Sequence, residues 1–153
     1  MQIQQVMMFA NTVLVMLAAA CPSLAIERIS LTSSNMQTNG DNYEPSLSAN
    51  GRIVSFEGQG SNVVPGLPSC CGQAYVRNRD LSTTEAVAVS TGGVLADRDS
   101  SFSLYRGNLS ANGRYTVFST DASNLAADAG VHEQIYLRDR QNKTTRLIST
   151  TAA

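Results

Sequence analysis

Short apolar runs separated by Gly, Asn, Ser and Thr follow one another along most of the chain. None keeps the 3.6-residue apolar period of an amphipathic helix, and β-branched and aromatic residues fill many of them. The pattern therefore predicts an all-β chain of short strands. These strands are expected at residues 43–48, 52–57, 73–78 and 85–90, and again at 104–110, 114–120, 133–139 and 145–150.

The predicted strands fall into two copies of one sequence unit. Residues 47–52, Leu-Ser-Ala-Asn-Gly-Arg, recur at 109–114, an offset of 62 residues (109 − 47). Residues 73–79 match residues 134–140 at an offset of 61. Asn50-Gly51 is expected to form a tight turn between the first two strands, because both residue types tolerate positive φ. Tandem four-stranded antiparallel units are typical of β-propeller blades, and a two-sheet sandwich is the rival fold.

The first 25 residues contain no Lys, Arg, Asp or Glu. An apolar run ends at Cys21, and Ser23 and Ala25 then supply a small-x-small pattern. Residues 1–25 are therefore predicted to be a signal peptide, cleaved after Ala25, which places the mature chain in the periplasm or outside the cell. Lipidation of Cys21 and an uncleaved anchor are the alternatives. We expect no transmembrane span in the mature chain.

The remaining chain divides into residues 26–42, a first blade at 43–91 and a second blade at 92–153. Residues 27–32 follow the pattern of a fourth strand, yet the second unit already has its own fourth strand. The extra strand is thus left without three partner strands. Because propellers typically hold about four to eight blades, we expect an incomplete propeller. It is either a truncated gene product or a chain that completes a ring by self-association.

The first unit resembles a known repeat. Residues 45–56, P-S-L-S-A-N-G-R-I-V-S-F, are similar to the WD40-like repeat of TolB-type β-propellers, which runs P-x-x-S-x-D-G-x-x-[IV]-x-F. Asn50 and Asn112 stand where the family has Asp, a change that a turn tolerates. The resemblance extends over residues 26–150. It implies a periplasmic or secreted propeller that works by protein interaction.

Composition removes several classes of function. The formal net charge is −1 and no basic stripe is visible, so nucleic-acid binding by counterion release is not expected. The single histidine, His132, is not accompanied by a Gly-x-Ser-x-Gly elbow. His-Glu-x-x-His and Cys-x-x-Cys are absent as well. We therefore predict no catalytic residue, no cofactor and no metal.

Two groups of residues remain as candidates for special chemistry. Cys70-Cys71 lies in the long loop of the first unit, where an exported chain could form a vicinal or an intermolecular disulfide. Free thiols and a redox pair are the alternatives. Acidic and amide side chains also cluster in the loops of the second unit, where turn capping is favoured over calcium binding. These are Asp97, Asp99, Asp121, Asn124 and Asp128.

The sequence thus predicts an exported, non-catalytic β-propeller repeat module that binds a protein or a component of the cell envelope. Two alternatives stay open. The chain could be the propeller part of a truncated hydrolase or peptidase-like enzyme, or a degenerate fragment without function.

Overall fold

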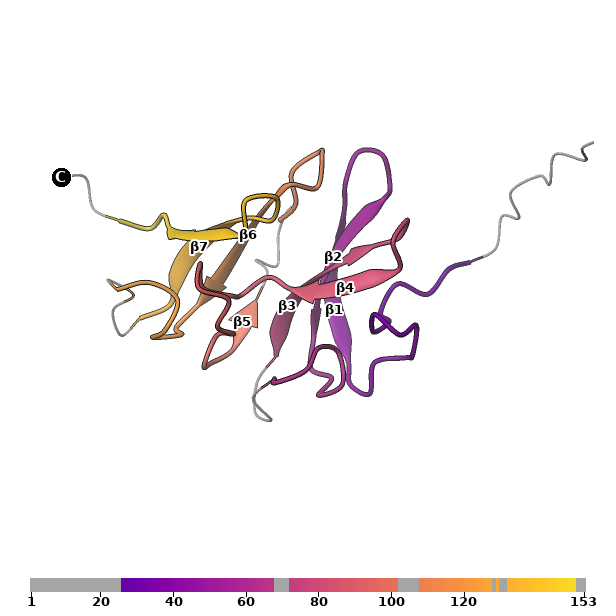
Figure 1. Ribbon diagram of the computed structural model, residues 1–153, viewed down its shortest axis with the longest axis horizontal. Helices are drawn as coiled ribbons and strands as arrows, with labels where there is room; N and C mark the ends of the chain where they lie inside the picture. Colours follow the sequence, from indigo (N-terminus) through magenta and orange to yellow (C-terminus); the bar gives the residue numbers. More distant parts are fainter. Residues whose placement is uncertain (1–25, 68–71, 102–107, 128, 130–131, 151–153) are drawn as a thin grey trace, which may run out of the picture.

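The computed structural model describes residues 26–67, 72–101, 108–127, 129 and 132–150. Over this part the chain is all-β, without a helix, and forms two four-stranded antiparallel sheets (Figure 1). In each sheet the strands lie side by side in sequence order, β1-β2-β3-β4 and β5-β6-β7-β8. The predicted all-β class and the two four-stranded units are confirmed. The strands are β1 (Asn42–Leu47), β2 (Ile53–Gly58), β3 (Gln73–Asn78), β4 (Thr83–Ala86), β5 (Ser100–Ser101), β6 (Tyr115–Thr120), β7 (Gln134–Asp139) and β8 (Thr144–Leu147).

The predicted bounds of the fourth strands were wrong. They were expected at 85–90 and 145–150, whereas β4 and β8 begin at Thr83 and Thr144 and are four residues long. Ser82 and Lys143, which precede these strands, take φ values of 53° and 56°. This left-handed backbone reverses the chain within a short turn, so pairing with β3 and β7 starts earlier than the polar sequence indicated.

The first strand of the second sheet also starts earlier than predicted. It was expected at 104–110, whereas β5 is Ser100–Ser101 and Leu109 forms an isolated bridge to Thr116. Residues 102–107 lie outside the described part. Contacts with the first sheet account for the early start: the amide of Ala74 donates to Ser100 Oγ at 3.0 Å, and this hydroxyl donates to Gln73 Oε1 at 3.0 Å. Ser100 is therefore tied to β3 of the first sheet.

The repeated hexapeptide forms a side-chain-capped turn in both sheets. Ser48 Oγ donates to Asn50 Oδ1 at 2.9 Å, and Asn50 Oδ1 also accepts a hydrogen bond from the amide of Arg52 at 3.0 Å. The second copy repeats these bonds at 2.8 and 3.0 Å. Within these two turns, only Gly51 and Gly113 have positive φ, with values of 70° and 71°. The predicted turn is confirmed, but the asparagine serves as a cap rather than as a left-handed residue.

The main hydrophobic core lies between the two sheets (Figure 1). One face of the second sheet, which carries Phe118 and Tyr136 stacked at 5.6 Å, packs against the first sheet. The turns touch as well: the amide of Ala49 donates to the carbonyl of Ala111 at 2.8 Å. Apolar burial is the main source of stability in such an interface. The core residues are Ala74, Val76, Val87, Ala88, Ala96, Leu109, Phe118, Ala122, Leu125 and Tyr136.

Candidate functional site

The N-terminal segment, residues 27–39, lies on the side of the first sheet away from the second (Figure 1). Two buried side chains hold it there. Arg77 Nη1 donates to the carbonyl of Thr32 at 2.8 Å, and its Nη2 donates to Asn35 Oδ1 at 2.5 Å. Thr84 Oγ1 donates to the carbonyl of Leu31 at 2.5 Å. The segment is therefore tied to β3 and β4 mainly by hydrogen bonds from buried groups.

Residues 85–97 make the same contacts with the second sheet. Arg138 Nη1 donates to the carbonyl of Val89 at 3.2 Å and to Thr145 Oγ1 at 3.0 Å. Thr145 Oγ1 in turn donates to the carbonyl of Val89. Residues 27–39 thus occupy, relative to the first sheet, the position that residues 85–97 occupy relative to the second.

An ion pair recurs in the same way. Arg140 Nε lies 2.6 Å from Glu85 Oε1, and Arg79 pairs with Glu27, 58 residues before Glu85 (85 − 27). The bond from Arg79 lowers the pKa of the Glu27 carboxyl. In the first sheet, Glu85 of β4 lies opposite Val76 of β3. Its counterpart in the second sheet is Arg146 of β8, which lies opposite Leu137 of β7. The second sheet thus presents a cation where the first presents an anion.

The face of the second sheet that points away from the first is apolar and uncovered. We call it the C-terminal face. Most of its positions are buried at the equivalent places in the first sheet: Ile135 is 44% exposed, whereas Ala74, 61 residues earlier, is 0% exposed. Val117 is 37% exposed and its counterpart Ser55 is 0% exposed. The face therefore lacks the cover that the first sheet has. It consists of Tyr115, Val117, Ile135 and Ile148.

The opposite end of the molecule has a matching face that is only partly covered, which we call the N-terminal face. It is the side of the first sheet that carries Leu47, Val54 and Phe56. Val54 and Phe56 are buried there, with Ile29 and Val63 packed around Phe56, whereas Leu47 on β1 is exposed. Leu47 is 59% exposed, whereas Leu109, its counterpart in the second sheet, is 9% exposed and lies in the core. The two faces are thus the two halves of the internal interface, each without its partner.

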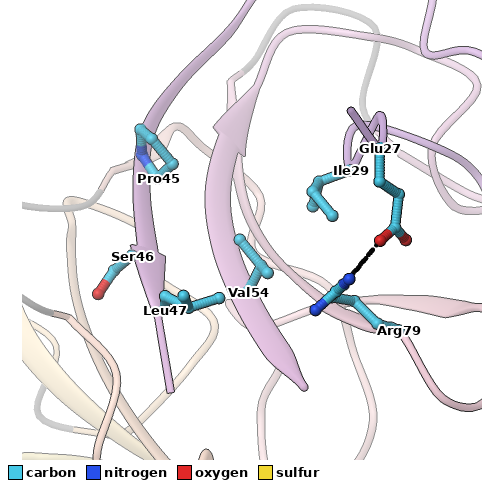
Figure 2. A pocket seen from close by; sticks show the side chains of 7 residues that line it. All are labelled: Glu27, Ile29, Pro45, Ser46, Leu47, Val54 and Arg79. Atoms are coloured by element: carbon cyan, nitrogen blue, oxygen red, sulfur yellow. Dashed lines mark hydrogen bonds and ion pairs between the residues drawn. The ribbon is translucent and has the colours of Figure 1, made fainter. Parts of the chain in front are cut away.

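A hollow of about 380 Å³ marks the N-terminal face (Figure 2). Figure 2 shows Leu47 on β1, Val54 on β2, and the Glu27–Arg79 ion pair on the other side of the hollow. Ile29 of the N-terminal segment also lines it. A mainly apolar hollow that is rimmed by one ion pair suits apolar side chains of a partner rather than a small charged ligand.

The residues that the sequence singled out do not form a reactive centre in the described part. Cys21, Cys70 and Cys71 lie outside it, so lipidation and a disulfide or redox pair stay predictions. His132 is exposed at the edge of a polar hollow, together with Asp99, Asp121, Ser119 and Glu133. Within the described residues, no group of three or more His, Cys, Asp and Glu side chains could hold a metal ion.

The loop carboxylates and amides bond to other loops of the second unit. Asn124 Oδ1 accepts the amide of Asp97 at 3.1 Å, and Asn124 Nδ2 donates to the carbonyl of Leu95 at 2.7 Å. Asp121 pairs with Arg98 at 3.1 Å. Asp128 lies outside the described residues. These bonds join two loops of the second unit, and Asp121 forms an ion pair, so they are not the local turn caps that the sequence predicted.

The chain matches no protein-family model and no curated protein. Among the residues that the structure describes, no helix is long and apolar enough to span a bilayer. The class that the fold and the faces define is an all-β protein built of two antiparallel four-stranded sheets.

Two tandem blades were expected to leave two sheet faces exposed, but the sequence alone did not identify the residues of these faces. Their members are ordinary strand residues, and only comparison of each exposed position with its buried counterpart distinguishes them. The signal that could have found them was the repeat offset, applied to Val117 and Ile135 against the smaller Ser55 and Ala74.

Proposed function

We propose that this chain is an exported β-propeller repeat module whose two sheets are blades, and that it acts by binding protein rather than by catalysis. One observation carries the proposal: apolar positions that are buried between the sheets have exposed counterparts, Val117 and Ile135 on the C-terminal face and Leu47 on the N-terminal face. A contiguous apolar surface on a folded domain is a mark of an interaction site. The unpartnered faces are thus the proposed binding surfaces.

The packing favours blades over a sandwich. In a sandwich each sheet buries its inner face and presents a polar outer face to water. Here Val117 and Ile135 lie on an outer face, and Leu47 lies on the other. Blades, in contrast, pack on neighbours through both faces. The capped turns of the two sheets also meet, through Ala49 and Ala111, as neighbouring repeats of one stack would.

The sequence supports the remaining parts of the proposal. The apolar leader at residues 1–25 supports export. The resemblance of residues 45–56 to the TolB-type repeat supports a propeller that works through protein contacts.

The test is site-specific photocrosslinking in the producing cell. A benzophenone amino acid replaces Leu47 on the N-terminal face or Ile135 on the C-terminal face. The matched control is Leu81, which is 70% exposed but lies in the turn after β3. We expect protein adducts from positions 47 and 135 and none from 81. Absence of adducts, or equal adducts from all three positions, would contradict the proposal.

A further inference from the structure

We propose that the protein partner is a second copy of this chain, docked head to tail, with the C-terminal face of one copy on the N-terminal face of the next. This inference rests on the proposed function and names its partner. The internal interface is the template, since the second sheet already packs on the first through these same two kinds of face. A contact between unlike faces is heterologous, so every added copy presents a fresh face to the next.

The side chains of the C-terminal face are larger than their counterparts in the internal interface. The second sheet has Val117 where the first has Ser55, and Ile135 where the first has Ala74. A face that met only solvent would gain nothing from this apolar bulk, whereas a buried face gains with each carbon removed from water. The C-terminal face is therefore suited to a partner with more room than the second sheet offers the first.

The N-terminal face has that room. Ala86 stands where the second sheet has Leu147, and Val63 stands where it has Leu125. Two hollows, of about 380 and about 210 Å³, lie over Val54 and its neighbours. Larger side chains on one face meet smaller ones on the other, as close packing of an interface requires.

The N-terminal segment of one copy and the residues around β8 of the other copy meet at this junction. Residues 27–30 of the receiving copy and residues 146–149 of the docking copy correspond to the same positions, 85–88, of the internal interface. The receiving segment is the weaker one, since residues 26–28 are exposed and a single exposed ion pair holds Glu27. The strand β8, in contrast, pairs with β7 along its length. Residues 26–28 of the receiving copy are therefore the part of the segment that β8 displaces.

Charge at the junction makes the inference specific. Displacement of Glu27 brings Arg146 of the docking copy beside Arg79, where the internal interface has Glu85 beside Arg140. A like-charge pair at an exposed position weakens assembly and is screened by salt. We therefore expect self-association to tighten as ionic strength rises. The substitution Arg146→Glu supplies a carboxylate where the internal interface has Glu85, and should lower the dissociation constant about fivefold.

The experiment is light scattering on the purified protein over a dilution series. The full gene is expressed with its leader, so that the cell sets the N-terminus, and a reducing agent excludes disulfide-linked dimers. We expect a mass that rises with concentration to between about two and four copies, because each copy holds two sheets and propellers hold about four to eight blades. A mass of one copy at all concentrations overturns the inference.

Mixing two blocked variants tests the direction of docking. Leu47→Glu blocks the N-terminal face and Ile135→Glu blocks the C-terminal face, whereas Leu81→Glu serves as the exposed control. Each blocked variant alone should stay at one copy, and an equimolar mixture should form a one-to-one dimer through the remaining intact faces. The control should match the unmodified chain, and circular dichroism verifies that each variant folds.

Several outcomes overturn the inference. They are a mixture that stays at one copy, a loss of assembly from only one of the two blocked variants, and an Arg146→Glu variant that does not associate more tightly. The crosslinking experiment separates this failure from failure of the proposed function. Adducts from positions 47 and 135 to a different protein would leave the binding function in place and remove only the second copy as partner.

Discussion

The contact between the two turns can be tested with a matched pair of glycine substitutions. Gly51 and Gly113 occupy equivalent turns with φ of 70° and 71°, so alanine at either site costs about 1–2 kcal/mol from left-handed backbone. Their surroundings differ. A Cβ at Gly113 would lie 2.6 Å from Ile53 Cγ1, whereas a Cβ at Gly51 would meet only Arg79 Nη1 at 3.7 Å. Gly113→Ala therefore also forces the sheets apart.

Overpacking of this kind adds about 1–3 kcal/mol. We expect Gly51→Ala to lower the free energy of unfolding by about 1–2 kcal/mol and Gly113→Ala by about 2–5 kcal/mol. Urea unfolding followed by circular dichroism, at low protein concentration, measures both. In an Ile53→Ala background, which removes Cγ1, the excess cost at position 113 should shrink. Equal losses at the two glycines would refute the packing of the second turn on Ile53.

Two further predictions concern polar groups. The guanidinium of Arg114 and the amides of Gln141 and Asn142 lower the pKa of Asp139 to about 2, below its ordinary value of about 3.9, so the stability from this carboxylate is present above about pH 4 and is lost as pH falls through 2. In acid titrations of stability, Asp139→Asn should flatten the curve between pH 4 and 2, and an unchanged slope would contradict this cause. Thr84→Val leaves the carbonyl of Leu31 unpaired and should cost about 1–3 kcal/mol, whereas Thr83→Val on the exposed side of β4 should cost much less by urea unfolding.

The repeat determined most of the fold in advance. Strand class follows from local composition, and the capped turn follows from Ser48, Asn50 and Gly51, whose side-chain and backbone bonds all lie within a few residues. Such local interactions are present in the sequence itself. The bounds of β4 and β5 could not be predicted in the same way. Ser100, for example, is held by Gln73, 27 residues away, and no local pattern encodes that bond.

The sites were less predictable than the fold. The loop residues Asp97 and Asn124 were expected to cap their own turns, whereas the amide of Asp97 donates to Asn124, 27 residues away, and Asn124 donates to the carbonyl of Leu95. No sequence pattern distinguishes Arg77 and Arg138 from other arginines, although the buried guanidinium of Arg77 and the half-buried guanidinium of Arg138 hold the segment that precedes each sheet. The sequence does not distinguish a surface arginine from a buried one. Only the tertiary arrangement shows which carbonyls it reaches.

The sequence by itself determined that the chain forms two equivalent four-stranded units joined in tandem, because strand-forming runs and turn residues act over short distances and recur at a fixed offset. Only the tertiary structure decided which face of each unit is covered. Leu47 and Leu109 occupy the same position in the two copies of the hexapeptide, yet Leu47 is exposed and Leu109 lies in the core. The physical reason is that burial depends on the neighbour: the second sheet packs on the first and buries Leu109, whereas Leu47 lies on the side of the first sheet away from the second.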